Sequence, residues 1–185
     1  RGALFWDHDP ARHIALTMDI NALAPMYVAH AFLPAMMADA GRPRRILNIA
    51  SAAGTVSNPR MSVYAASKWA VIGWSDSLRL ELEQQGFGHL KVTTFCPSYI
   101  STGMFAGARG PLFTPLMTPD DAVNRAWRAT VAGQPQLIAP ATAQLGKVLR
   151  GLLPVRAWDF VGGKIFGIYT TMDKFTGRTD KAATP

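Results

Sequence analysis

The segment Arg45-Ile-Leu-Asn-Ile-Ala-Ser51 is a short apolar run that ends on a serine, and Tyr64-Ala-Ala-Ser-Lys68 begins thirteen residues after that serine. A short apolar run bounded by turn residues is typical of a buried strand in a parallel sheet. The second stretch opens a helical pattern that continues through Ala70, Trp74, Leu78 and Leu82 and ends near Gly86. These two stretches therefore predict a strand followed by a helix, which is the repeating unit of an α/β fold.

The same alternation extends on both sides of this unit. Residues 10 to 40 have a helical pattern that starts at Asp9-Pro10, and Pro25 and Pro34 should kink or divide it. A second strand is expected over residues 90–96, a helix from Thr118 as N-cap to about residue 132, and a short third strand over residues 136–139. The order predicts parallel strands with right-handed crossovers. Ligands bind beyond the carboxyl ends of such strands, so Ser51 and the segment 97–102 should meet at one crevice.

Tyr64 and Lys68 are four residues apart and therefore share one face of the helix. A free tyrosine has a pKa of about 10 and is a poor base at neutral pH. A lysine ammonium nearby favours the phenolate and should lower that pKa. Tyr64 could then move a proton while the hydroxyl of Ser51 polarises the same substrate oxygen.

This pattern resembles the classical short-chain dehydrogenase/reductase family, whose signature is a serine followed by Tyr-x-x-x-Lys about a dozen residues later. The resemblance implies an oxidoreductase that transfers a hydride between NAD or NADP and an alcohol or carbonyl carbon. Tyr64 would be the general acid/base and would also contact the cofactor, Lys68 would bind the nicotinamide ribose, and Ser51 would position the substrate oxygen. The fold would be the C-terminal portion of a doubly wound, Rossmann-like parallel sheet.

Two further motifs carry the same resemblance. Asn21, in Met18-Asp-Ile-Asn21-Ala, matches the asparagine that the family uses to hold a proton-relay water beside the lysine. The run from Cys96 through Pro97 to Thr102 resembles the family's Pro-Gly-x-x-x-Thr segment, so Pro97, Ile100 and Thr102 would contact the cofactor. Ser98 replaces the usual glycine, and a positive φ there would strain the loop.

The chain starts at Arg1, and no Gly-x-x-x-Gly-x-Gly turn precedes Ser51. By the resemblance, the first strands and their phosphate-binding turn are therefore missing. We expect residues 1–141 to form the catalytic portion and residues 142–185 to form a basic and apolar extension.

Composition excludes several classes of protein. The chain has 185 residues, 49% of them hydrophobic, which is enough for one globular core. Its single cysteine excludes an internal disulfide and favours a reducing, cytoplasmic compartment. The four histidines lack metal-ligand spacing, so a catalytic metal is not expected. No long apolar run resembles a membrane span. The net charge is +7, but no motif supports nucleic-acid binding.

Short matches at Thr102-Gly-Met-Phe105, Leu152-Leu-Pro154 and Met172-Asp-Lys-Phe175 resemble the retinol and hydroxysteroid dehydrogenase branch, which implies a lipophilic substrate. Apolar Met104, Phe105, Phe113 and Met117 could line its lid or pack on the core. Residues 142–185 hold seven basic and three acidic side chains among aromatic ones, which suits either a substrate lid or a peripheral membrane contact. The family also implies a homo-oligomer. The alternative function is a non-catalytic membrane- or partner-binding module, or an inactive fragment.

Overall fold

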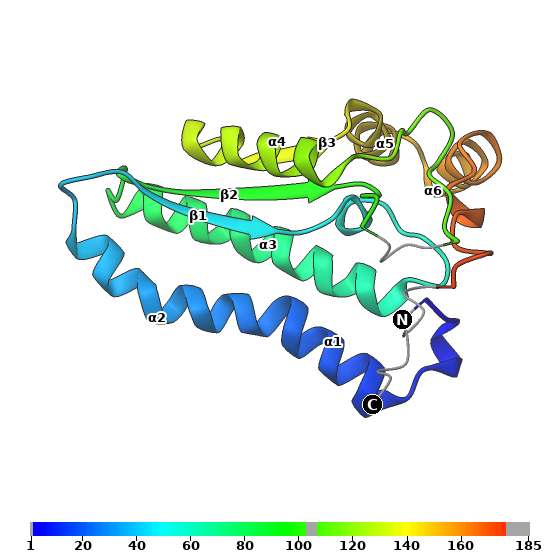
Figure 1. Ribbon diagram of the computed structural model, residues 1–185, viewed down its shortest axis with the longest axis horizontal. Helices are drawn as coiled ribbons and strands as arrows, with labels where there is room; N and C mark the ends of the chain where they lie inside the picture. The colour runs from blue at the N-terminus through cyan, green and yellow to red at the C-terminus, as the bar shows by residue number, and fades with distance from the viewer. Residues whose placement is uncertain (1, 103–106, 177–185) are drawn as a thin grey trace, which may run out of the picture.

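The computed structural model describes residues 2–102 and 107–176 of the chain. Its centre is a parallel sheet of three strands in the order β1 (Arg44–Ile49), β2 (Leu90–Pro97) and β3 (Gln136–Ala139). Helix α3 (Ser62–Gln84) joins β1 to β2, and helix α4 (Pro119–Ala132) joins β2 to β3. The two helices cover opposite faces of the sheet (Figure 1). The predicted strands, helices and parallel crossovers are confirmed.

The central strand β2 explains why the sheet is covered on both faces. Successive side chains of a strand point to opposite faces, so neighbours on β2 enter different layers of the core. Cys96 packs with Val71 of α3 and Ala50, whereas Phe95 packs with Ala122 and Ala126 of α4. This double burial is the physical basis of the nearly unbroken apolar pattern of the strand.

The ends of the helices follow local capping chemistry. Thr118 Oγ1 accepts a hydrogen bond from the Asp121 backbone N–H at 3.2 Å, as the N-cap prediction requires. Gly133 and Gly86 take left-handed backbone conformations just after α4 and α3. A side chain at either position would be strained, so both helices stop where a glycine allows the chain to turn.

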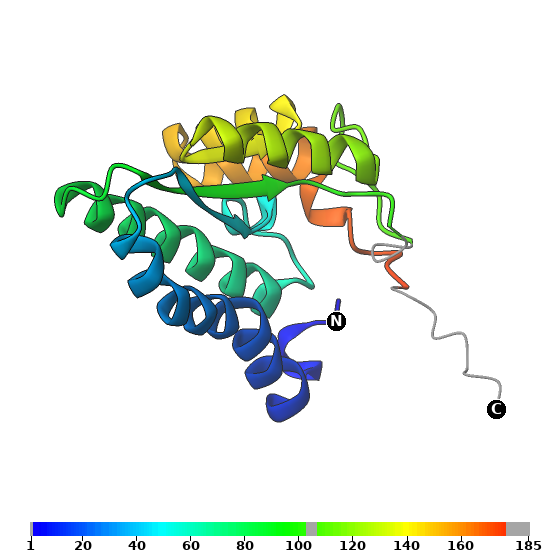
Figure 2. The same ribbon diagram turned by 60° about the vertical axis from the view of Figure 1, so that its left-hand side comes forward.

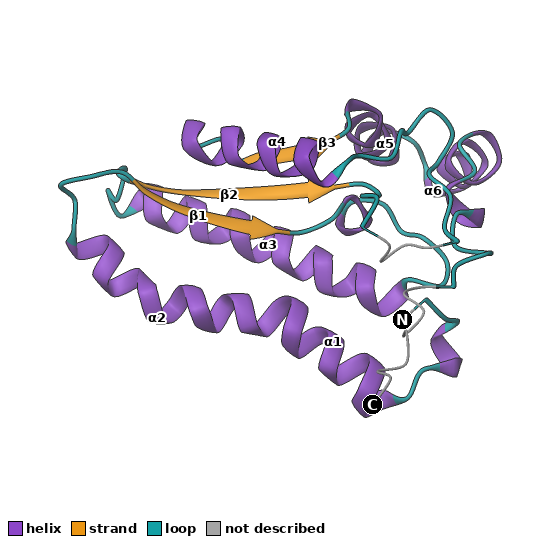
Figure 3. Cartoon of the chain, viewed as in Figure 1, coloured by secondary structure: helices purple, strands orange, loops and turns teal. Residues whose placement is uncertain are grey.

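The first long helical rod runs from Pro10 to Ala38 and packs along α3 (Figure 3). It consists of a π-helical stretch η2 (Pro10–Ala15), a short α1 (Leu16–Met18), a second π-helical stretch η3 (Asp19–Leu23) and α2 (Ala24–Ala38). Pro25 lies in the first turn of α2 and Pro34 lies inside it, so the helix continues through both prolines. The expected division at the prolines does not occur, and the irregular turns precede Pro25 instead.

By length and composition alone, this rod could cross a membrane, which corrects the expectation that no apolar run resembles a span. One such helix is weak evidence for a span, because the core helix of a soluble protein passes the same test. Here one side packs on α3, and the other leaves apolar side chains exposed at Leu16, Ile20, Leu23, Tyr27, Val28 and Phe32.

The C-terminal part of the chain closes the end of the molecule where β1 and β2 finish (Figure 2). Helix α5 (Ala141–Leu152) follows β3, then come α6 (Val155–Trp158), the π-helical η5 (Asp159–Ile165) and a short η6 (Ile168–Thr170). Ala143 of α5 packs into the same core cluster as Val71 and Cys96. A division of the chain near residue 141 stays a prediction.

Candidate active site

Ser51 lies directly beyond the end of β1 and begins the short 3₁₀ turn η4 (Ala52–Gly54). Its Oγ accepts a hydrogen bond from the Ala53 N–H at 3.2 Å and donates one to the Pro97 carbonyl at 3.5 Å. The second bond joins the ends of β1 and β2. The segments expected to converge at this edge of the sheet therefore do so.

Tyr64 and Lys68 face Ser51 from the first two turns of α3. The Ser51 hydroxyl lies close enough to the Tyr64 phenol to lower its pKa. Lys68 Nζ lies 5.7 Å from the centroid of the Tyr64 ring and donates to the Ile49 carbonyl at 3.0 Å. Three of the four predicted catalytic side chains thus form one cluster.

Gly54 allows this cluster to form, and sequence reasoning overlooked it. A Cβ at this position would lie 2.8 Å from both the backbone carbon and the backbone oxygen of Lys68. The turn that follows Ser51 consequently packs directly on the backbone of α3. A glycine beside a helix leaves no mark in a periodic pattern, because the contact is with a residue fourteen positions away.

The pKa of Tyr64 differs from the expectation. Burial raises the pKa above its usual 10.0, and this effect outweighs that of the nearby Ser51 hydroxyl, which lowers the pKa. Burial also lowers the pKa of Lys68, so desolvation favours the neutral form of each group. The sequence argument counted the lysine charge but could not weigh the burial of the phenol.

Asn21 lies in η3, within the irregular part of the first rod. Its Nδ2 donates to Ser67 Oγ at 3.1 Å, and Ser67 in turn donates to the Tyr64 carbonyl at 2.7 Å. The structure therefore places Asn21 against the catalytic helix, beside the residue that precedes Lys68. Its part in a proton relay stays a prediction.

The segment after β2 is tied to its neighbours mainly through the backbone. Ser98 N–H donates to the Ala139 carbonyl at 2.8 Å, and Ser101 N–H donates to the Met117 carbonyl at 3.0 Å. Thr102 N–H donates to the Ile100 carbonyl at 2.8 Å. Within residues 2–102 and 107–176, the non-glycine residues with a left-handed φ are Arg60 and Phe113. Ser98 is not one of them, so the backbone strain expected for a positive φ at this position does not arise.

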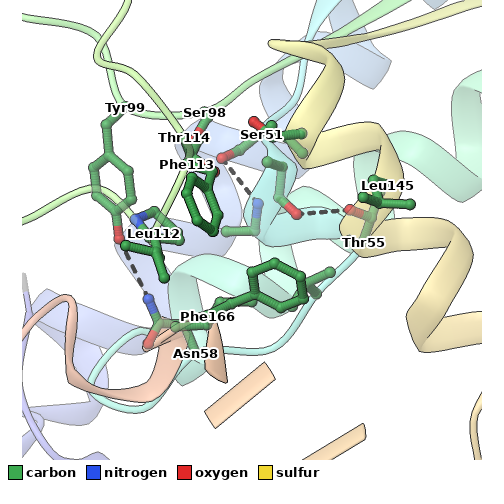
Figure 4. A pocket seen from close by; sticks show the side chains of 18 of the residues that line it. Ser51, Thr55, Asn58, Ser98, Tyr99, Leu112, Phe113, Thr114, Leu145 and Phe166 are labelled. Carbon is green, nitrogen blue, oxygen red and sulfur yellow. Dashed lines mark hydrogen bonds between the residues drawn. The ribbon is translucent and has the colours of Figure 1, made fainter. Parts of the chain in front are cut away.

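A cavity of about 350 Å³ opens beside Ser51 (Figure 4), and we call it the Ser51 cavity. Its walls are mainly apolar and come from the loop after β1, the loop after β2, residues 111–114, α5 and the segment after η5. The apolar and aromatic side chains include Val56, Met61, Leu112, Phe113, Leu145, Phe166 and Ile168. The polar ones include Thr55, Asn58, Tyr99 and Thr142.

Most of these wall residues could not be found from the sequence. Phe113 lines the cavity, as expected for a residue of a substrate lid. Met117 is instead buried in the core with Phe95, which was the alternative prediction. Met104 and Phe105 lie outside the described residues. The remaining walls come from segments far apart in the chain, and no local motif marks them.

The sequence profile of short chain dehydrogenases matches residues 3–111. Estradiol 17-beta-dehydrogenase 11 of Pongo abelii is 33% identical over 153 residues, which cover 83% of this chain and 49% of that protein. Epidermal retinol dehydrogenase 2 of Mus musculus is 30% identical over 167 residues, which cover 89% of this chain and 53% of that protein. Retinol dehydrogenase 10 of Xenopus tropicalis is 34% identical over 153 residues, which cover 80% of this chain and 44% of that protein.

Solved structures share the fold. A short chain dehydrogenase from Burkholderia cenocepacia, in complex with NADP, superposes with a TM-score of 0.67 at 25% identity, over 85% of this chain and 61% of that one. A short chain dehydrogenase/reductase from Burkholderia phymatum, in complex with NAD, has a TM-score of 0.68 at 20% identity, over 81% and 61%. The chain spans about half the length of the curated relatives it matches. With the sheet, the Ser51–Tyr64–Lys68 cluster and these matches in agreement, the chain belongs to the short-chain dehydrogenase family.

Proposed function

We propose that the full-length protein is an oxidoreductase that transfers a hydride between NAD or NADP and a lipophilic alcohol or carbonyl compound. One observation carries the proposal: Ser51, whose hydroxyl lies beside the Tyr64 phenol, is in the wall of a mainly apolar cavity at the carboxyl ends of the strands. The site therefore combines a proton-transfer group with a hydrophobic binding space. Neither feature alone would define the reaction.

The residues present fit a nicotinamide cofactor. A lysine ammonium carries three N–H donors, and Lys68 directs one of them to the Ile49 carbonyl, so others remain for ribose hydroxyls. Pro97 and Ile100 offer backbone at the same edge of the sheet, and Thr102 adds a hydroxyl. When bound, a nicotinamide would accept or supply the hydride. The relatives in complex with NADP and with NAD support this class of cofactor without choosing between the two.

The chain's own groups would handle the proton and the substrate oxygen. In alcohol oxidation, Ser51 Oγ holds the substrate oxygen by a hydrogen bond while the Tyr64 phenolate takes the hydroxyl proton. In carbonyl reduction, the neutral Tyr64 phenol donates that proton, and Ser51 polarises the carbonyl. Asn21 would connect the Lys68 end of the site to solvent.

The walls of the cavity favour a lipophilic substrate. Phe113, Phe166 and Leu145 offer apolar surface, and a pocket of this kind binds apolar molecules through burial. The names of the relatives point to retinol and estradiol, which are both largely apolar alcohols. These compounds define the substrate class that we propose for this protein.

The C-terminal region also supports a peripheral contact with anionic lipid. Leu145, Val148 and Leu152 share one side of α5 by their spacing and are exposed, and Leu145 also lines the Ser51 cavity. Exposed basic residues lie among them and beyond at Lys147, Arg156 and Lys164. An apolar stripe with basic neighbours suits the surface of an anionic membrane. A cytoplasmic location and a homo-oligomer stay proposals.

The activity can be tested on the purified full-length protein. We expect a rise in reduced-nucleotide absorbance when retinol or estradiol is added with NAD or NADP, with a higher kcat/KM than for a short polar alcohol such as ethylene glycol. Absence of turnover with every alcohol and both nucleotides, in either direction, would support the non-catalytic alternative.

A further inference from the structure

Three polar side chains from distant segments meet at one side of the Ser51 cavity: Asn58, Tyr99 and Thr171. Asn58 Nδ2 donates to Thr171 Oγ1 at 2.7 Å and to Tyr99 Oη at 3.3 Å. Tyr99 Oη donates to Thr171 Oγ1 at 3.0 Å. Figure 4 shows Tyr99 and Asn58 together, on the side away from Thr55 and Leu145. We call this group the Tyr99 cluster.

The cluster joins three of the segments that surround the site. Asn58 lies in the loop that leads into the catalytic helix α3, Tyr99 lies in the proposed cofactor segment, and Thr171 follows η6. Thr171 is 3% exposed, and its Oγ1 accepts two hydrogen bonds and donates a third to the Ile168 carbonyl at 2.9 Å. Such an interlocked network holds its members in one arrangement.

Backbone contacts extend this link to the wall of the cavity. Arg109 N–H donates to the Thr171 carbonyl at 3.0 Å, and Leu112 N–H donates to the Phe166 carbonyl at 2.9 Å. Phe166, Ile168 and Leu112 all line the cavity. A shift of Thr171 would therefore move the wall formed by residues 166–168 and the neighbouring residues 109–112.

We propose that the hydroxyl of Tyr99 is a positioning group that selects for bulky substrates by fixing this wall. The proposal rests on the proposed function, because it concerns how the substrate is held during hydride transfer. A large apolar alcohol fills the cavity and needs the wall in place for its reacting carbon to be oriented. A small alcohol does not reach the wall and depends on Ser51 and Tyr64 alone.

This role differs from proton transfer. The Tyr99 hydroxyl is engaged with Thr171 and Asn58, and its burial favours the neutral phenol. Tyr64 remains the phenol that lies beside Ser51. Because Tyr99 also contributes to the raised pKa of Tyr64, the pH dependence is read from Thr171→Val, which removes no titratable group and should leave it unchanged.

The test compares Tyr99→Phe and Thr171→Val in the full-length protein with NAD or NADP, using retinol or estradiol as the bulky substrate and 2-propanol as the small one. We expect kcat/KM for the bulky alcohol to fall about tenfold relative to the small alcohol in both variants, chiefly through KM. Tyr169→Phe is the matched control, because its hydroxyl bonds the exposed Asp159 at 2.6 Å and its side chain is not part of the Ser51 cavity wall. It should keep the wild-type ratio.

Equal losses for both alcohols, no loss for either, or a shifted pH profile in Thr171→Val would overturn the proposal. So would a loss in Tyr99→Phe without one in Thr171→Val, since that result would mean direct binding of the substrate by the hydroxyl. Hydrogen exchange gives a readout that needs no turnover. The amides of Arg109 and Leu112 should exchange faster in both variants, while those of α3 near Leu78 should not change. Unchanged exchange at Arg109 and Leu112 would also overturn the proposal. A wild-type protein without turnover would count against the proposed function alone, and exchange would then decide whether the cluster fixes the wall.

Discussion

The region from β1 to the end of α3 and the region that closes the cavity hold their functional side chains by different means. In the first, Ser51, Tyr64 and Lys68 lie on one strand end and one long helix, within twenty residues of one another. In the second, Phe113 and Phe166 lie on short turns and loops, and one link between their segments is the hydrogen bond from the Leu112 N–H to the Phe166 carbonyl. The chemical groups thus sit on rigid elements, whereas the substrate-contacting groups sit where the chain can vary.

The largest effect expected from this difference is on Tyr64. Tyr64→Phe removes the proton-transfer hydroxyl while keeping the ring, so kcat should fall by ~10²–10⁴-fold. Cofactor affinity should stay nearly intact, because Lys68 and the segment after β2 are untouched. Steady-state kinetics and a calorimetric titration with NAD or NADP check both parts, and Tyr27→Phe on the exposed side of α2 is the control. Activity that survives Tyr64→Phe would sink the assigned mechanism.

The pH dependence tests whether burial or the lysine charge controls Tyr64. Because the pKa is raised above 10.0, the phenolate fraction should grow about tenfold per pH unit throughout the range below that pKa. Alcohol oxidation needs the phenolate, so its kcat/KM should climb from pH 7 to pH 10. Carbonyl reduction needs the phenol and should stay flat over the same range. A plateau of oxidation near pH 7 would show that the charge of Lys68 outweighs burial.

The rigid packing of the catalytic region can be tested at Gly54. Gly54→Ala forces a methyl group against the Lys68 backbone and should lower the free energy of unfolding by ~1–3 kcal/mol, with a loss of turnover. Gly73→Ala is the matched control, because Gly73 lies in α3 and, apart from its chain neighbours and the nearby backbone of the helix, nothing lies within 4 Å of its added Cβ. That change should raise stability by up to ~1 kcal/mol. Chemical denaturation of both variants makes the comparison, and equal stabilities would refute the close contact.

The smallest effect concerns the C-terminal surface. Arg156→Ser and Lys164→Ser each remove one exposed basic side chain and should each weaken binding to vesicles rich in phosphatidylserine by about 1 kcal/mol, or roughly fivefold. Binding to neutral phosphatidylcholine vesicles is the reference. Lys91→Ser, on β2, controls for net charge alone. If all three variants behave alike, this surface makes no specific lipid contact.

The same contrast explains what could be predicted from the sequence. The strands, α3, α4 and the cap at Thr118 follow from local periodicity and capping, and the Ser51–Tyr64–Lys68 cluster follows from spacing within one strand–helix unit. The wall at Phe166, the Tyr99 cluster and the contact at Gly54 depend on residues that meet only in the folded chain. The direction of the Tyr64 pKa shift belongs to this second group, because burial is a tertiary property.

The most direct test of the central claim follows the hydride itself. The full-length protein would be given an apolar secondary alcohol deuterated at the carbinol carbon, with oxidised NAD or NADP in ordinary water, and the nucleotide would be examined by mass spectrometry. Direct transfer at the Ser51–Tyr64–Lys68 site predicts one deuterium in the reduced nucleotide, with almost none formed by Tyr64→Phe. Reduced nucleotide without deuterium, or equal labelling by Tyr64→Phe, would contradict the account.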